Sequence, residues 1–157
     1  MPPRFLFDIS GIDLTKVIYG QEVIRECNPQ RGDMEQLDGV VYMDTSKERL
    51  IAYKDVRLDE FWVPGHIPGR PLLPGVLMIE AAAQAASFYM RKGMGWNGFV
   101  GFGAVDECKF RQPVAPGCRL YILAQKTWER HFRFSCDIQG IVEGNLVFET
   151  SLVGTKM

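Results

Sequence analysis

The chain has 157 residues, of which 46% are hydrophobic and 24% charged, and its formal net charge is −1. This length and composition predict one domain over residues 1–157, with an N-terminal extension over residues 1–36. The balanced charge argues against nucleic acid as a partner. Two histidines far apart and four cysteines without C-x-x-C spacing predict no metal site. The early charges in M-P-P-R-F-L-F-D do not suit a secretory signal, and together with the cysteines they favour a reducing cytoplasm.

The first 56 residues predict one short helix and one hairpin of two strands. Residues 12–24 favour a helix, and residues 27–33 (C-N-P-Q-R-G-D) favour a loop. Residues 40–43 and 49–56 are typical of strands, and D-T-S-K-E at 44–48 between them is typical of a turn. A loop dense in proline and glycine follows over residues 59–74.

The run over residues 71–90, P-L-L-P-G-V-L-M-I-E-A-A-A-Q-A-A-S-F-Y-M, predicts a buried helix. It approaches the length that crosses a membrane, but prolines crowd its start and Glu80 lies near its centre, so we expect no membrane insertion. Pro74 and Gly75 suit its first turn, and R-K-G at 91–93 suits its end. Because this helix is apolar on nearly every face, the rest of the chain should cover nearly every face.

Four strand-like segments follow, over residues 99–110, 120–128, 131–141 and 146–153. Turns are expected at 116–117 and 143–145, and E-R at 129–130 predicts a tight hairpin. Two strands, a long helix and four further strands predict an α+β fold, in which a curved antiparallel sheet wraps around a central helix.

One acid and one histidine indicate a functional site. Glu80 is the only carboxylate in the apolar run, and His66 lies in the preceding loop, G-H-I-P-G-R-P. A carboxylate in an apolar helix carries a desolvation cost unless it is paired or neutral, whereas a histidine titrates near neutrality. We therefore expect a buried Glu80 and His66 to move protons across one pocket. Taken alone, His66 is more typical of a surface turn, so the joint pattern favours the site.

Two sequence blocks resemble one enzyme family. Residues 66–84, H-I-P-G-R-P-L-L-P-G-V-L-M-I-E-A-A-A-Q, resemble the active-site signature of the FabZ-type β-hydroxyacyl-acyl-carrier-protein dehydratases, H-F-P-G-x-P-x-x-P-G-V-L-x-x-E-A-x-A-Q. Residues 105–117, V-D-E-C-K-F-R-Q-P-V-A-P-G, resemble the family's second block. The resemblance covers residues 38–154. It implies the hot-dog fold and the dehydration of (3R)-3-hydroxyacyl thioesters to trans-2-enoyl thioesters, in fatty-acid or related lipid or polyketide biosynthesis.

The resemblance also implies a role for each matching residue. His66 is then the base, and Glu80 orients the leaving hydroxyl and supplies its proton. The N–H of Gly75 points at the thioester carbonyl, which suits the unpaired N–H groups of a helix start. Gln84 follows Glu80 by one helical turn and positions its carboxyl. The catalytic unit implied is a homodimer with shared sites, compatible with three dimers in a hexamer.

The acyl group should occupy a tunnel, and its carrier should dock nearby. The resemblance implies a substrate on the phosphopantetheine of an acyl carrier protein or on coenzyme A, with no cofactor of the enzyme's own. Candidates for the tunnel lining are Ile67, Met78, Gly101 and Phe102. Ile67 stands where the family usually has Phe, and Gly101 stands where an aromatic residue is common.

Three basic residues are candidates for docking the acidic surface of a carrier protein, although a solvated strand face also accounts for them. They are Lys109, Arg111 and Arg130.

Two other functions stay open from the sequence. A hot-dog acyl thioesterase is one, although such enzymes usually lack the H-x-P-G-x-P-x-x-P-G block. A non-catalytic subunit that binds the acyl carrier is the other. It is suggested by residues 29–40, P-Q-R-G-D-M-E-Q-L-D-G-V, which lack the aromatic and the proline that the family usually has there.

Overall fold

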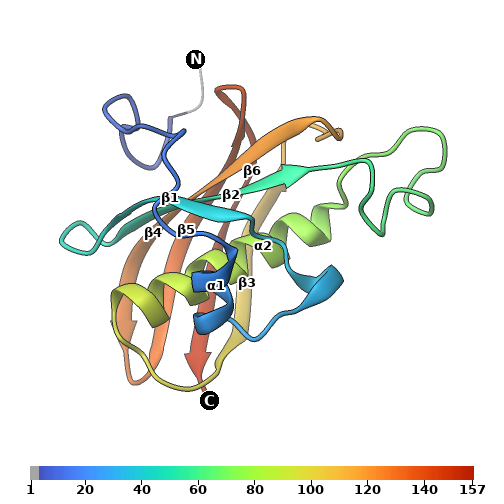
Figure 1. Ribbon diagram of the computed structural model, residues 1–157. Coiled ribbons are helices and arrows are strands. Elements are labelled where there is room, and N and C mark those ends of the chain that lie inside the picture. The colour runs from blue at the N-terminus through green and yellow to red at the C-terminus, as the bar shows by residue number, and fades with distance from the viewer. Residues whose placement is uncertain (1–3) are drawn as a thin grey trace.

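The computed structural model describes residues 4–157, and among them one long helix lies across a six-stranded antiparallel sheet (Figure 1). The helices are α1 (Gln21–Cys27) and α2 (Gly75–Phe88), with a 3-10 turn η1 (Gly32–Met34) and a π-helical turn η2 (Tyr89–Gly93). The strands are β1 (Gly39–Asp44), β2 (Arg49–Val56), β3 (Val100–Phe110), β4 (Cys118–Arg130), β5 (Arg133–Val142) and β6 (Asn145–Lys156). Their spatial order is β1-β2-β4-β5-β6-β3. This arrangement confirms the predicted α+β hot-dog fold.

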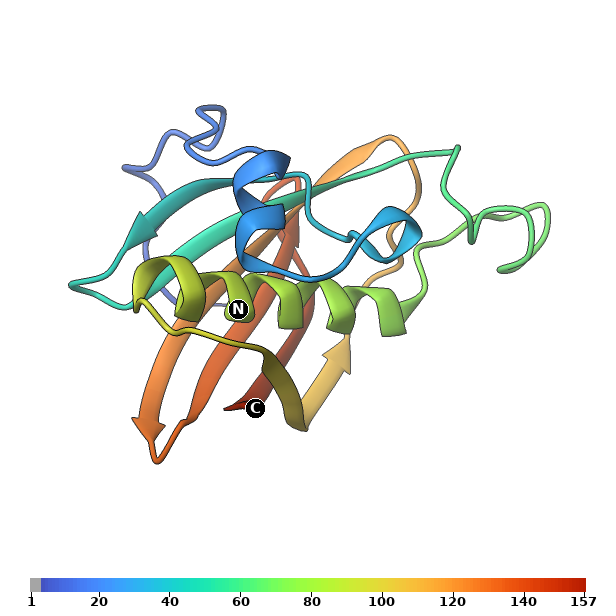
Figure 2. The same ribbon diagram turned by 60° about the horizontal axis from the view of Figure 1, so that its bottom comes forward.

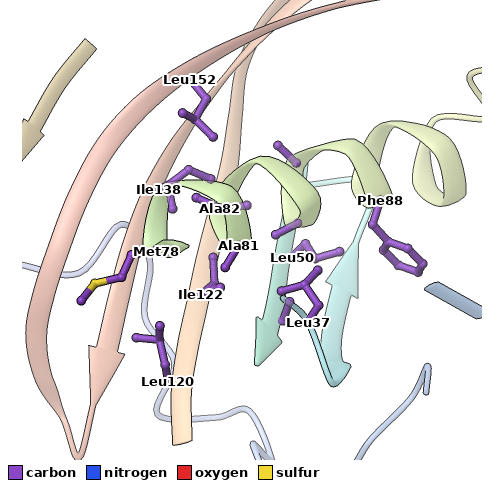
Figure 3. Close-up of a cluster of buried hydrophobic side chains, with 14 of the residues drawn as sticks. Leu37, Leu50, Met78, Ala81, Ala82, Phe88, Leu120, Ile122, Ile138 and Leu152 are labelled. Atoms are coloured by element: carbon purple, nitrogen blue, oxygen red, sulfur yellow. The ribbon is translucent and has the colours of Figure 1, made fainter. Parts of the chain in front are cut away.

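Helix α2 turns small side chains toward the sheet. Ala81 and Ala82 are fully buried, and they lie beside Ile122 of β4 and Ile138 of β5 (Figure 3). Small residues allow the helix backbone to approach the curved sheet closely, so the core is filled by the branched side chains of the strands. The long loop between β2 and α2 projects away from this core (Figure 2).

The start of α2 is not covered in the single chain. Val76 is 72% exposed, and Leu77 and Ile79 are only half-buried, so the expected cover on nearly every face is wrong for one chain alone. The adjacent strand β3 is an edge of the sheet, and it exposes Phe102 and Phe110. Large exposed apolar side chains on a helix start and a sheet edge form a surface that suits a protein partner.

The predicted helix over residues 12–24 is wrong in its position, because α1 covers only Gln21–Cys27. Residues 5–14 pack on the face of the sheet opposite α2, where Phe7 is buried. Gln139 of β5 fixes this segment, since its Oε1 accepts from Leu6 N at 2.8 Å and its Nε2 donates to Arg4 O at 3.0 Å. Burial against the sheet therefore overrides the helical pattern, and the helix begins only after Gly20.

The hairpin between β4 and β5 turns two residues later than predicted. Arg130 pairs with Arg133, so His131 and Phe132 form the turn, with φ values of 51° and 59°. Two residues with positive φ suit the twist of a two-residue hairpin. The sequence lacks the Asn-Gly or Asp-Gly pair that usually indicates such a turn, which explains the error.

Candidate active site

Hydrogen bonds fix the orientation of His66 in the loop before α2. Its backbone N–H donates to Trp62 O at 2.8 Å, and its ring Nδ1 lies 2.8 Å from Leu72 O. Because a carbonyl oxygen can only accept a hydrogen bond, Nδ1 must carry the proton. The neutral ring then has its free lone pair on Nε2. The next residue, Ile67, has a φ of 57°, which is unusual for a β-branched side chain and marks a constrained turn.

His66 shares an open hollow of about 500 Å³ with the start of α2. Gly75, Ile67 and Met78 also line this hollow. The first hydrogen bond of the helix runs from Leu77 N to Pro74 O, so the N–H of Gly75 has no partner within the helix. A Cβ on Gly75 would lie 2.8 Å from ring carbons of Phe110, so a larger residue there would have to displace that ring. The N–H of Gly75 is therefore a donor without a helical partner, at the hollow that His66 also lines.

Glu80 lies in a second hollow, of about 150 Å³, between α2 and the start of β3. Gly101 and Phe102 line this hollow with it, whereas Ile67 and Met78 line the hollow of His66. The sequence predicts a buried Glu80, and in the single chain it is half-buried. Within one chain, the structure does not bring His66 and Glu80 into one pocket.

The side-chain amide of Gln84 holds the carboxyl of Glu80 in place by a hydrogen bond. Gln84 is 3% exposed, and its Nε2 donates to Glu80 Oε1 at 2.9 Å and to Met34 O at 2.6 Å. Its Oε1 accepts from Gln36 N at 2.9 Å. The amide therefore ties the carboxyl to η1 and the segment that follows it, and this fixes one face of Glu80.

The segment from Asn28 to Gln36 is the part of the site that sequence reasoning missed. Asn28 Nδ2 donates to Gln84 O at 3.0 Å, so the segment is fastened to α2 a further time. Gln30 lines the hollow of Glu80, and its Oε1 is buried without a hydrogen-bond partner. Nothing in the sequence pattern indicated that this segment belongs to the site, because residues 29–40 depart from the pattern of the family that the chain resembles.

The three candidate docking residues lie in two places. Arg111 lines the hollow of His66 and forms an ion pair with Glu149 at 3.0 Å. Lys109 also pairs in register with Glu149, so it lies near Arg111. Arg130 pairs with Arg133, which is in register with Thr155 near the opposite end of β3. Arg130 therefore belongs to the other end of the sheet.

Other kinds of site have no support in residues 4–157. That part of the chain holds no group of three His, Cys, Asp or Glu side chains placed to bind a metal ion. None of its helices combines the length and the apolar character needed to cross a membrane.

Comparison with known proteins identifies the family of the chain. The model of the FabA-like domain family matches residues 28–151. A 3-hydroxyacyl-[acyl-carrier-protein] dehydratase FabZ of Agrobacterium fabrum is 37% identical over 151 residues, covering 92% of this chain and 96% of the relative. A bifunctional enzyme LpxC/FabZ of Chlorobaculum tepidum is 36% identical over 90% of this chain, which spans 30% of that protein.

The fold has relatives among solved structures. The dehydratase heterocomplex ApeI:P from Xenorhabdus doucetiae superposes with a TM-score of 0.72 at 16% identity, over 85% of this chain and 90% of that one. At this identity the likeness concerns the fold alone. From the family model and the high coverage of its curated relatives, we conclude that the chain belongs to the FabA-like family, among the FabZ-type dehydratases.

Proposed function

We propose that this protein dehydrates (3R)-3-hydroxyacyl thioesters on acyl carrier protein to trans-2-enoyl thioesters, in fatty-acid or related lipid or polyketide biosynthesis. The observation that carries the proposal is the His66 ring, whose Nδ1 is engaged by Leu72 O beside the free N–H of Gly75. A base and an oxyanion donor in one hollow are what proton removal next to a thioester carbonyl requires.

In the proposed reaction, His66 Nε2 takes a proton from C2 as the C2–H bond breaks. The negative charge that develops on the thioester oxygen is stabilised by the N–H of Gly75 and the positive end of α2. The C3–O bond then breaks, a C2=C3 double bond forms, and the hydroxyl leaves as water with a proton from Glu80. The proton taken up by His66 then passes to Glu80 through solvent, which restores both groups for the next turnover. Only protons and a hydroxyl move, so the reaction requires no redox cofactor.

The working enzyme is proposed to be a homodimer in which His66 of one subunit faces Glu80 of the other. Two observations support this: His66 and Glu80 line separate hollows in one chain, and apolar side chains are exposed around Val76 and along the edge strand β3. A second copy on this surface would bury the apolar side chains and bring the complementary hollow to each histidine.

The carrier is proposed to dock beside the hollow of His66, where Lys109 is exposed and Arg111 lies. Positive groups there would steer an acidic carrier protein toward the site. Arg130 lies too far along the sheet to belong to the same patch in one chain. The four free cysteines suit a reducing compartment, which we take to be the cytoplasm.

The test is turnover of a 3-hydroxyacyl carrier thioester, measured as enoyl formation and as free-thiol release in the same samples. His66→Ala and Glu80→Gln are expected to abolish enoyl formation. His131→Ala is the matched control, because His131 is the other histidine and lies exposed in the β4–β5 turn. Enoyl formation by His66→Ala at the wild-type rate would refute the assignment. Thiol release without enoyl would indicate a thioesterase.

A further inference from the structure

The hollow of Glu80 continues along α2 into a second, polar cleft. The hollow of Glu80 has a mainly apolar wall, which includes Phe134 and Leu152. A cleft of about 290 Å³ adjoins it, and the two share Ser87, Phe99 and Val100 as lining residues. The polar cleft is lined by three arginines, Arg25, Arg31 and Arg91.

One stripe of the helical segment runs through both spaces. Glu80, Ala83, Ser87 and Arg91 follow one another at intervals of three or four residues, so they lie on one face. Glu80 and Ala83 line the apolar hollow, Ser87 lines both spaces, and Arg91 lines only the polar cleft. The stripe therefore changes from a carboxylate, through a small side chain, to a guanidinium.

The hollow of Glu80 is the acyl tunnel that the resemblance implies, because it contains Gly101 and Phe102. We propose that Arg91, in the adjoining cleft, sets the upper limit of the acyl-chain length. This inference rests on the proposed function, because it places C3 of the acyl group at Glu80. The apolar lining suits hydrocarbon, whereas a chain that passes Ser87 enters a cleft of cationic side chains. Hydrocarbon packed against Arg91 displaces water from a guanidinium that has one carbonyl, Gly98 O, as its protein partner, and this desolvation is unfavourable.

Arg91 is held in place at this boundary. Its Nη1 donates to Gly98 O, so the side chain is fastened to the loop that leads to β3. Arg31 is also tied down, since it donates to Asn28 O at 2.8 Å and to Arg25 O at 2.9 Å. Arg25 forms an ion pair with Glu35. The polar end of the channel is thus built of fixed groups.

The distance along α2 from Glu80 to Ser87 sets the length of acyl chain that the hollow can hold. Ser87 follows Glu80 by seven residues, which is about 10 Å along a helix axis. An extended chain of single bonds advances about 1.2 Å per bond, by the reach of a polypeptide backbone, so about eight carbons beyond C3 reach Ser87. Counting C1 to C3 as well, the longest acyl group that fits has about eleven carbons, by the same advance per bond. Longer chains must displace Arg91.

The experiment compares kcat/KM for hydroxyacyl carriers of eight and sixteen carbons. The wild-type protein is expected to favour the eight-carbon substrate, and Arg91→Leu is expected to raise the relative rate of the sixteen-carbon one. Each further methylene that leaves water contributes about fourfold in binding, so a gain of tenfold or more is expected. Lys92→Leu is the matched control. It removes the same charge one residue later, and the Lys92 ammonium lies over the ring of Tyr19, outside both spaces.

A second variant keeps the test decisive if Arg91→Leu folds poorly. Ser87→Phe narrows the junction between the two spaces, one helical turn before Arg91, so the eight-carbon substrate should lose more turnover than a four-carbon one. Equal use of eight- and sixteen-carbon chains by the wild-type protein would overturn the inference. So would an unchanged chain-length ratio in Arg91→Leu or Ser87→Phe. Absence of turnover on every chain length would instead overturn the proposed function.

Discussion

Replacing Gln84 with leucine should show whether its amide positions Glu80 for catalysis or only stabilises the fold. The substitution keeps the volume roughly constant but removes the amide, whose donors bind Glu80 Oε1 and Met34 O and whose oxygen accepts from Gln36 N. Leaving the buried N–H of Gln36 and the partly buried carbonyl of Met34 unpaired costs about 2–4 kcal/mol in all. A small domain has a total stability of about 5–15 kcal/mol, so Gln84→Leu should still fold.

The catalytic effect is expected to exceed what the lost stability explains. Without the amide, Glu80 is held only by its own helix position, and misplacement of a catalytic group by about 1 Å can cost about 100-fold in rate. We expect kcat for enoyl formation to fall by about 10- to 100-fold, with a smaller change in KM. The assays are steady-state kinetics and urea unfolding on the same preparations.

Gln139→Leu is the control for this prediction. Gln139 is 7% exposed, and its amide bridges two backbone groups, at Arg4 and Leu6, on the face of the sheet opposite α2. It should lose a similar amount of stability and keep its kcat. If Gln84→Leu and Gln139→Leu have the same kcat, the positioning role of Gln84 is wrong.

Three further predictions concern the fold. Lys54→Met should lower the free energy of unfolding by about 3 kcal/mol, because it leaves the buried carboxylate of Glu60 without its partner. Adding Glu60→Leu should recover part of this loss, measured by urea unfolding. No recovery in the double variant would contradict the ion-pair argument. His131→Asn with Phe132→Gly should raise the melting temperature and leave kcat unchanged, since both positions have positive φ; a lower melting temperature would contradict the turn assignment. Burial raises the pKa of Cys136 from 9.0 to about 12, so above pH 9 the folded state keeps a proton that the unfolded state releases. The free energy of unfolding should therefore fall by about 1 kcal/mol between pH 9 and pH 10. In Cys136→Ala this dependence of the unfolding free energy on pH should disappear from urea unfolding. An unchanged dependence would show that Cys136 is not its source.

Most of the fold could be predicted because its pattern is local. Each strand is a run of β-forming residues bounded by turn residues, and α2 is bounded by Pro74 and by the glycine of η2. Residues 4–14 could not be predicted, because their conformation depends on Gln139 and the distant sheet face that buries Phe7. The β4–β5 turn could not be placed either, since His131 and Phe132 are not residues that usually adopt positive φ.

The candidate site was predictable residue by residue, but its arrangement was not. His66, Gly75, Glu80 and Gln84 lie in one short sequence block, so motif resemblance found them together. That block does not tell which residues face one hollow, and the chain itself separates His66 from Glu80. The contribution of Asn28 and Gln36 depends on hydrogen bonds between segments about 50 residues apart, for which the sequence carries no local signal.

The shared active site is tested most directly by mixing two inactive variants, His66→Ala and Glu80→Gln, after unfolding and refolding them together. If each site takes its histidine and its glutamate from different subunits, a mixed dimer contains one intact site and one site lacking both groups. Random pairing of equal amounts then restores about a quarter of the wild-type activity in a two-fold dimer. If both groups of a site come from one chain, no combination contains an intact site. Recovery near one quarter is the result predicted here, and a mixture as inactive as its two components, although dimeric, would contradict the account.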